Sequence, residues 1–207
     1  MESMNGWKVE NLTRIILMNT KNRKMKVTKQ QWIDATANLK KRRASWKNYD
    51  DNIKLEKPIR NYGDHLKKCG YGNSILDVGC GSQTLRKFIP GEINYTGIDA
   101  FPVENTDSIK MAIEESTFEP KSFDTVCAFA VLDNCFDFDQ ACQKIKEIAR
   151  INIIILTGIN IKIDKYHTFN LQLEDFNRNF EDMNLTHCEE ISSKVYLLNY
   201  KHHEKNN

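Results

Sequence analysis

The sequence predicts an α/β fold: a doubly wound, mostly parallel seven-stranded sheet with a C-terminal antiparallel hairpin, preceded by N-terminal helices. Three observations predict it. From residue 74 onward, short apolar runs typical of strands covered on both faces alternate with helical segments. The last two strand-like runs are separated only by Ser192-Ser193, as in a hairpin. A glycine turn follows the first apolar run, and an acidic residue ends the second.

The N-terminal part of the chain has a helical pattern. Apolar residues recur at helical spacing in Trp7–Met18 and again in Gln31–Tyr49, where Trp32, Ile33, Ala35, Leu39 and Trp46 are the candidate apolar contacts. A basic connector, Lys21–Lys29, separates these two helices, and a third short helix over Pro58–Cys69 is closed by Gly70 and Gly72. We therefore expect residues 1–69 to form a basic helical cover segment and residues 70–207 to form the α/β domain.

The elements of the α/β domain follow in order. The predicted strands are Ser74–Val78, Tyr95–Asp99, Ser108–Ile113, Thr125–Phe129, Ile153–Thr157, Thr186–Ile191 and Lys194–Tyr200. The predicted helices are one that starts near Ser82 and continues through Phe88, then Phe138–Arg150 and Leu171–Met183.

Composition limits the class of protein. Hydrophobic residues make up 40% and charged residues 28% of the 207 residues, which is typical of a soluble globular protein. The longest apolar run, Ile151–Gly158, is far shorter than a membrane span, and Met1–Trp7 lacks a signal-peptide pattern. We expect a cytoplasmic protein.

The six cysteines (Cys69, Cys80, Cys127, Cys135, Cys142 and Cys188) fall on predicted strands and helices, and none forms a C-x-x-C pair. Because cysteine is among the most buried residue types, we interpret them as free thiols. The same spacing argues against a structural zinc site, and the sequence predicts no metal centre.

Charge is unevenly distributed along the chain. Residues 1–49 contain 12 Lys and Arg against three acidic residues, whereas the remainder contains 18 against 25. The cluster Lys40–Arg43, with Trp32, Trp46 and Tyr49 around it, has two interpretations. The aromatic residues pack the segment onto the sheet while the basic side chains face water, which we favour, or together they bind a nucleic acid.

The most informative stretch is Ile75–Ser82, in which a buried strand runs into Gly79 and Gly81. Glycine permits a tight turn and a close approach of the backbone to a ligand. The second strand ends at Asp99, where a carboxylate can bind both hydroxyls of a ribose. The dinucleotide fingerprint needs a third glycine, but Thr84 stands at that position, which favours a nucleoside ligand without a pyrophosphate.

The stretch Asp77-Val78-Gly79-Cys80-Gly81 resembles the first motif of class I S-adenosylmethionine-dependent methyltransferases, in particular the broad ubiquinone-biosynthesis-type group. The similarity covers roughly residues 70–200 and continues at Tyr95–Asp99, Ser122–Val126 and Ala130–Asp133.

The resemblance implies S-adenosyl-L-methionine as cofactor. It implies that Asp77, Gly79 and Gly81 line its methionine end, that Asp99 holds the ribose, and that Ile98 or Ala100 contacts the adenine. The predicted cofactor-binding residues are Asp77, Gly79, Cys80, Gly81, Asp99, Ala100, Glu114, Glu115 and Ala130.

Two positions depart from the family's pattern. Ser82-Gln83 follows the second glycine where the family often has a third small residue. An Asp-Ala pair usually follows the third strand to reach the adenine amino group, whereas this chain reads Met111-Ala112-Ile113-Glu114-Glu115. Glu114 or Glu115 is therefore the expected substitute.

For catalysis, positioning of the two reactants is the main requirement, and a hydroxyl or acidic carbon acceptor also needs a general base. Candidates follow the fourth and fifth strands: Asp133 and His167, the latter either a base or a histidine bonded to a nearby loop backbone. Asp133-Asn134 alone is weak evidence for a magnesium site.

The acceptor remains open in the sequence. The segment Ala130–Asn134 lacks the Asn/Asp-Pro-Pro-aromatic motif of enzymes that methylate the amino groups of nucleic-acid bases, and no Pro-Cys nucleophile is present. We expect a small-molecule hydroxyl, amine or acidic carbon. The alternatives are RNA or another macromolecule bound by the basic N-terminal segment, and a non-catalytic cofactor-binding partner of another protein.

Overall fold

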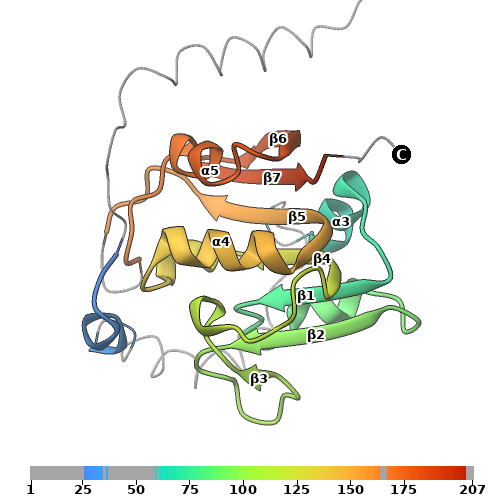
Figure 1. The fold of residues 1–207 in the computed structure, drawn as a ribbon, viewed down its shortest axis with the longest axis horizontal. Coiled ribbons are helices and arrows are strands. Elements are labelled where there is room, and N and C mark those ends of the chain that lie inside the picture. Colours follow the sequence, from blue (N-terminus) through green and yellow to red (C-terminus); the bar gives the residue numbers. More distant parts are fainter. Residues whose placement is uncertain (1–25, 35, 37–58, 60, 164–166, 204–207) are drawn as a thin grey trace, which may run out of the picture.

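A computed structural model describes residues 26–34, 36, 59, 61–163 and 167–203. The strands are β1 (Ser74–Val78), β2 (Asn94–Asp99), β3 (Ile109–Lys110), β4 (Phe123–Phe129), β5 (Ala149–Gly158), β6 (Asn184–Ser192) and β7 (Val195–Lys201). They form one seven-stranded sheet in the order β3-β2-β1-β4-β5-β7-β6 (Figure 1). The first five strands pair in parallel, and β7 is antiparallel to both of its neighbours. The predicted fold class is confirmed.

Helices cover both faces of the sheet. The helices are α3 (Tyr62–Cys69), α4 (Phe138–Ile148) and α5 (Leu173–Asn179), with the 3-10 turns η2 (Thr84–Phe88), η3 (Ile113–Glu115) and η4 (Leu132–Asn134). One hydrophobic cluster joins α4 and α5 to one face of the sheet, and a second joins α3 and η2 to the other. Central strands therefore bury side chains in both directions, which explains their continuous apolar runs.

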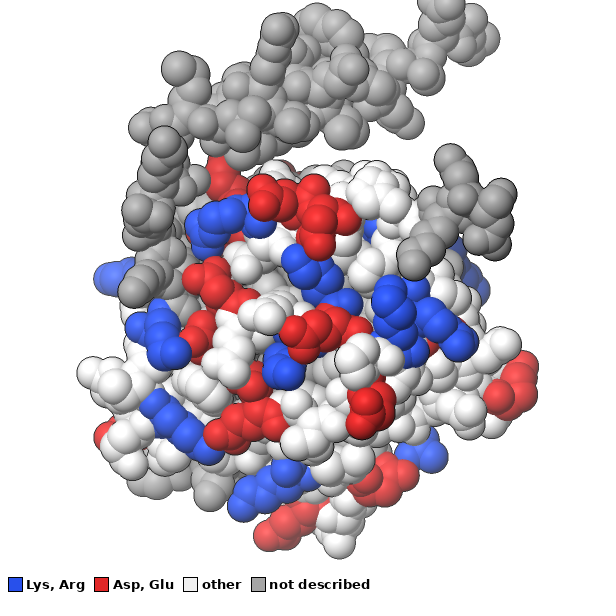
Figure 2. Space-filling view, in the orientation of Figure 1, with Lys and Arg blue, Asp and Glu red and all other residues white. Residues whose placement is uncertain are grey.

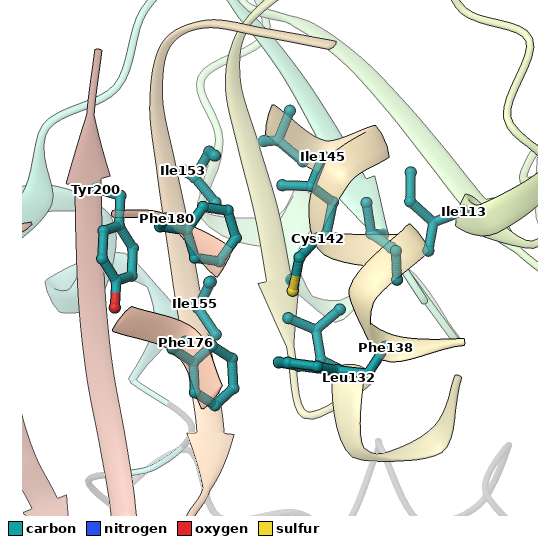
Figure 3. Packing of buried hydrophobic residues seen from close by; sticks show 14 of the residues in the cluster. Ile113, Leu132, Phe138, Cys142, Ile145, Ile153, Ile155, Phe176, Phe180 and Tyr200 are labelled. Carbon is teal, nitrogen blue, oxygen red and sulfur yellow. The ribbon is translucent and has the colours of Figure 1, made fainter. Parts of the chain in front are cut away.

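The larger core lies between α4, α5 and the sheet (Figure 3). Phe138, Cys142 and Ile145 repeat at helical spacing along α4 and are fully buried. The ring of Phe138 meets that of Phe176 on α5 edge-on, with centroids 5.2 Å apart. Asp137 caps α4 by accepting a hydrogen bond from the backbone N–H of Gln140 at 3.1 Å. This packing fixes the end of β4, from which the polypeptide enters η4.

Several predicted boundaries were wrong because tertiary pairing overrides local pattern. The helix predicted over Phe138–Arg150 ends at Ile148, since Ala149 pairs with Phe123 of β4 and begins β5. The helix after the glycine turn is only a 3-10 turn, and Pro90 follows it at once. The other predicted helices are shorter by a few residues, α3 beginning at Tyr62 and α5 spanning Leu173–Asn179.

The predicted strand Ser108–Ile113 was also too long. Only Ile109 and Lys110 pair with β2, and the chain then turns through η3. Ile113 is buried in the core, and Glu114 accepts the backbone N–H of Phe136 at 2.7 Å. Because of these contacts the chain leaves the sheet after Lys110, so the edge strand β3 has only two residues.

The N-terminal residues of the described chain lie at the edge toward which the parallel strands point (Figure 1). Residues 29–34 and 36 are helical. Trp32 is buried, as expected, but Ile33 is 38% exposed because its position on the helix faces away from the domain. The predicted helix Trp7–Met18 and the cluster Lys40–Arg43 lie outside the described residues.

Basic and acidic side chains are interspersed over the face that Figure 2 shows. Ion pairs across α4 and α5 account for part of this, including Lys146 with Asp182 and Arg178 with Asp139, at 2.8 and 3.1 Å. Among the described residues, no helix has the length and apolar character needed to cross a membrane.

Candidate functional site

The glycine turn between β1 and η2 lies at the carboxyl end of the parallel strands. Gly79 and Gly81 have φ values of 68° and 53°, in the left-handed region that favours glycine. A Cβ on Gly79 would lie 2.2 Å from a methyl carbon of Val131, whereas one on Gly81 would meet no atom within 4 Å. Gly79 therefore permits close packing against the end of β4, and Gly81 leaves an open cradle beside the turn.

Asp99 closes the other side of this turn from the end of β2. Its Oδ2 accepts the backbone N–H of Gly81 at 3.1 Å, and its Oδ1 accepts that of Phe101 at 2.7 Å. The side chain is buried, with 3% of the residue exposed. Strand order thus brings together two sequence motifs that are separated by 18 residues, and the carboxylate is oriented by the backbone on both sides.

Asp77 lies in β1, two residues before Gly79, and does not line the pocket described below. Its Oδ2 accepts a hydrogen bond from the Tyr95 hydroxyl at 2.6 Å. Burial raises the pKa of Asp77 to about 7, the hydrogen bond from Tyr95 opposes this shift, and the charge of Asp99 adds to it. The Asp77 carboxyl therefore holds a proton at a higher pH than an exposed aspartate does.

A pocket opens beside the turn, between the ends of β1, β2 and β4. Its lining combines residues from the turn, from the segment 99–114, from η4 and from the N-terminal helix. The lining residues are Trp32, Thr36, Val78, Gly79, Asp99, Ala100, Phe101, Met111, Ala112, Ile113, Glu114, Val131, Leu132, Asn134 and Cys135. Gly79, Asp99, Ala100 and Glu114, four of the residues predicted from the sequence, therefore meet at one pocket with a largely apolar wall.

The two glutamates after β3 have different surroundings. Glu114 is buried and lines the pocket, and its Oε1 accepts the backbone N–H groups of Phe136 and Asp137 at 2.7 and 3.3 Å. Burial raises the pKa of Glu114, although these backbone donors oppose the shift. Glu115 lies outside the lining and accepts a hydrogen bond from Lys29. The structure thus brings Glu114 to the pocket but not Glu115.

Three other predicted residues, Cys80, Gly81 and Ala130, lie near the pocket without lining it. Cys80 is buried beneath the turn, where a Cβ on Gly97 would lie 2.9 Å from its Sγ. Ala130 directly follows β4 with a φ of 53°, and its backbone N–H donates to the Leu156 carbonyl at 2.7 Å. A left-handed alanine at the end of a central strand is the kind of backbone strain that gathers at functional sites.

The two predicted catalytic residues lie together. His167, in the loop between β5 and α5, places its Nε2 3.6 Å from Oδ2 of Asp133 in η4. The Asp133 side chain is 9% exposed and that of His167 is 32% exposed. The Asp133 carbonyl accepts the backbone N–H groups of Thr168 and Phe169 at 2.8 and 3.0 Å, which fastens the loop to η4. Leu132 and Asn134, the neighbours of Asp133, line the pocket.

Two residues of the described N-terminal segment (26–34 and 36), Trp32 and Thr36, line the pocket. Trp32 Nε1 donates to the Asn134 carbonyl at 2.5 Å, and its ring lies 5.2 Å from that of Phe101. The Lys26 ammonium pairs with Asp137 at 2.6 Å, and the Val27 N–H donates to Phe136 O at 2.9 Å. The aromatic Trp32 therefore packs onto the domain, which was the favoured interpretation of this residue.

Sequence reasoning missed several pocket residues. Phe101 and Leu132 each adjoin a predicted site residue, so their positions carried a partial signal. Thr36 lies far from the motifs in sequence, and no pattern marks it. All six cysteines are free thiols, as predicted, and all but Cys188 are buried. Within the described ranges, no three His, Cys, Asp or Glu side chains gather in an arrangement suited to a metal ion.

Comparison with known proteins identifies the kind of domain. Residues 76–155, from β1 into β5, match the family model described as a methyltransferase domain. No curated protein matches the chain.

Solved structures share the fold. A SAM-dependent methyltransferase from Aquifex aeolicus is similar with a TM-score of 0.58 at 15% identity, covering 77% of this chain and 97% of that one. The 1,6-didemethyltoxoflavin-N1-methyltransferase of Burkholderia thailandensis, solved with 1,6-didemethyltoxoflavin and S-adenosylhomocysteine, has a TM-score of 0.62 at 8% identity and covers 90% of this chain and 94% of that one. At these identities the likeness shows the fold.

Proposed function

Since this chain carries a class I S-adenosylmethionine-dependent methyltransferase domain, we propose that it methylates a small molecule at a hydroxyl, an amine or an acidic carbon, with His167 as general base. The observation that carries the proposal is the pairing of His167 with the buried Asp133 beside the pocket, at 3.6 Å. The Burkholderia relative was solved with a small-molecule acceptor, which supports the same class here. Nothing in the described residues favours a nucleic-acid acceptor over this class.

The pocket offers polar residues for the polar groups of S-adenosylmethionine and apolar residues for its adenine ring. We assign the ribose hydroxyls to the buried carboxylate of Asp99, and the adenine to the apolar wall that includes Ala100, Phe101 and Leu132. Glu114 is the other carboxylate of the lining besides Asp99 and is our candidate for binding the adenine amino group. Gly81, where a side chain would meet no neighbouring atom, leaves room for the methionine end. When bound, the cofactor supplies an electrophilic methyl group on a sulfonium.

The residues of the chain then have two tasks. The pocket walls hold the acceptor and exclude water, so that much of the rate comes from alignment of the reacting atoms. His167 would take the proton from the acceptor atom that receives the methyl group. The Asp133 carboxylate orients the imidazole and stabilises its protonated form. An acceptor whose O–H or C–H must ionise needs such a base most.

The test replaces the base and its partner. We expect His167→Gln to lower the turnover number by roughly 10²- to 10⁴-fold, the usual contribution of a general base. Asp133→Asn should lower it less, because the imidazole remains. Cofactor affinity, measured by calorimetry, should stay within a fewfold of wild type for both variants. The acceptor itself is found by mass spectrometry of cell extract incubated with the protein and isotopically labelled cofactor.

A matched control is available on the hairpin. His187 on β6 also pairs with a carboxylate, with its Nε2 3.1 Å from Oε2 of Glu189. His187→Gln removes the same chemical group from strand β6, whereas the loop of His167 is bonded to η4 beside the pocket, so this control should leave turnover unchanged. Unchanged turnover in His167→Gln would reject the base, and a cofactor that does not bind the wild-type protein would reject the site.

A further inference from the structure

The pocket has two walls that are joined closely at one end only, where Val78 pairs with Ile98 and the Gly81 N–H donates to Asp99 Oδ2 at 3.1 Å. One wall is the glycine turn. The other is the segment 99–113, which contributes Asp99, Ala100, Phe101, Met111, Ala112 and Ile113 to the lining. This second wall returns to the sheet through β3, which pairs with β2 at only two positions, Ile98 with Ile109 and Asp99 with Lys110. Beyond Asp99 the short β3 ladder leaves a role for other contacts in setting the distance between the walls.

Gln83 supplies such a contact from an unusual backbone position. It follows the second glycine of the turn and has a φ of 59°, in the left-handed region where glycine is favoured. The residue is 9% exposed, and its Nε2 donates to Oδ1 of Asp107 at 2.5 Å. A glutamine in this conformation is strained relative to glycine. Unlike glycine, Gln83 has a side chain that reaches Asp107 in the opposite wall.

Asp107 is held on its other oxygen as well. Arg86 of η2 donates from its Nη1 to Oδ2 of Asp107 at 2.5 Å. The guanidinium carbon of Arg86 also lies 5.5 Å from the centroid of the Tyr95 ring, whose hydroxyl donates to Asp77. One carboxylate in the second wall thus joins two side chains from the first. Arg86 and Asp107 are half-exposed or more, so their ion pair by itself adds little to the stability of the fold.

We propose that Gln83, Asp107 and Arg86 form a clasp that sets the separation of the two pocket walls and thereby the affinity for the cofactor, with Gln83 as its positioning residue. The inference rests on the cofactor site proposed above. It assigns a role to the glutamine that stands where the resembling family often has a small residue. The clasp touches neither the reacting atoms nor the pocket lining, so its effect belongs to binding and not to the chemical step.

The decisive variant is Gln83→Gly. It relieves the left-handed backbone and removes the side chain, so the melting temperature should stay the same or rise while the clasp is lost. We expect the dissociation constant for S-adenosylmethionine, and for S-adenosylhomocysteine, to rise roughly tenfold, as for one lost hydrogen bond of ordinary strength. If Gln83 had only a structural role, replacing it would lower the melting temperature. A variant as stable as wild type would then bind the cofactor with wild-type affinity.

Substitutions at Asp107 act on both arms of the clasp. Asp107→Ala removes the contacts to Gln83 and to Arg86, so it should weaken binding at least as much as Gln83→Gly does, and the double variant should be no worse than Asp107→Ala alone. Asp107→Asn retains an oxygen that can accept from Gln83, so it should lie between Asp107→Ala and wild type. Glu104→Ala removes an exposed acid from the same loop. This control should bind normally, which excludes a simple effect of charge on the cationic cofactor.

The outcomes are distinguishable by calorimetry and thermal denaturation together. Weaker binding with an unchanged or higher melting temperature supports the clasp. Wild-type affinity in both Gln83→Gly and Asp107→Ala overturns it and leaves the cofactor site intact. Additive losses in the double variant also overturn it, since the two residues would then act independently. A wild-type protein that binds neither cofactor nor product would overturn the site as well as the clasp.

Discussion

Individual residues at this site hold conformations and protonation states that the fold alone does not need. Gln83 and Ala130 both have positive φ values without being glycine. Asp77 is 3% exposed and keeps a carboxyl group in a place where burial opposes its charge. Such strained or desolvated groups gather at functional sites, because binding and catalysis need them there. Asn105, Lys121, Asn160 and Lys194 also have positive φ. The position of Gln83, Ala130 and Asp77 near the glycine turn, and not strain alone, therefore agrees with the proposed cofactor site.

The raised pKa of Asp77 predicts a pH dependence of stability. The folded-state pKa is about 7 and the ordinary value is 3.8, so between these values the folded state holds a proton that the unfolded state has released. Stability therefore falls as the pH rises from about 4 to about 7, and does not change further above that range from this group. Wild type should lose about 2–3 kcal/mol of unfolding free energy from this source between pH 5 and pH 8.

Asp77→Asn removes the titration and retains an oxygen that can accept from Tyr95. Urea denaturation at pH 5 and pH 8 should show a smaller loss of stability in this variant than in wild type. Glu92→Gln, at an exposed position in the turn before β2, serves as the control and should follow wild type. Parallel pH profiles of wild type and Asp77→Asn would show that the Asp77 carboxyl titrates in its ordinary range.

At the scale of elements, the described N-terminal segment (26–34 and 36) contacts the loops around the pocket. It contacts the residues after η4 through a backbone hydrogen bond from Val27 to Phe136 and through the salt bridge from Lys26 to Asp137. Trp32 forms a small cluster with Ala112 and Phe136 that is separate from the two main cores. Val27 also packs against the larger core, so the segment connects residues of the pocket lining with the domain.

We predict that Trp32→Ala weakens cofactor binding more than it destabilises the domain. The change removes a lining side chain, the hydrogen bond to Asn134 and the ring contacts to Phe101 and Phe136. We expect a roughly tenfold to hundredfold rise in the dissociation constant for S-adenosylmethionine, on the scale of a buried aromatic anchor. Calorimetry gives the affinity and thermal denaturation gives the stability.

Trp32→Phe separates the two contributions of this side chain, since it retains an aromatic ring and removes the indole N–H. It should bind the cofactor with an affinity between those of Trp32→Ala and wild type. Ile33→Ala, at the exposed neighbouring position, is the matched control and should bind normally. Equal affinity in Trp32→Ala and wild type would mean that the segment has no part in the site.

At the scale of the whole molecule, a buried polar ladder crosses the sheet on the α3 side. Asn152 of β5 accepts from the Thr125 hydroxyl at 2.7 Å and donates to the Gly70 carbonyl at 2.8 Å and to Oδ1 of Asn199 at 3.2 Å. Asn199 of β7 in turn donates to the carbonyl of Cys69 at 3.2 Å. The ladder joins three strands to the end of α3, and its members satisfy one another in a buried site.

We predict that Asn152→Ala lowers the unfolding free energy by about 2–4 kcal/mol, because it leaves buried partners without their hydrogen bonds and opens a cavity. The unfolding midpoint in urea measures the loss. Ile151→Ala is the control on the same strand: Ile151 is 45% exposed, and its loss should change stability by about 0.5 kcal/mol or less. A midpoint for Asn152→Ala equal to that of the control would show that the ladder adds nothing to stability.

The sequence by itself determined the class of the fold, the first two strands with the glycine turn between them, and the hairpin that closes the sheet. These features depend on local causes: periodicity of apolar residues, the backbone freedom of Gly79 and Gly81, and short connections. The end of β2 at Asp99 was predictable for the same reason, and β1 has the bounds that its apolar run predicts.

Only the tertiary structure decided which residues meet. It shortened β3 to two residues, because Ile113 and Glu114 find partners in the core and on the loop before α4. It brought Trp32 to a pocket far from it in sequence, directed Glu115 toward Lys29, and set Gln83 against Asp107. Such contacts depend on which side chains point toward one another across the edge of the sheet. The spacing of residues along the chain does not determine the direction of these side chains.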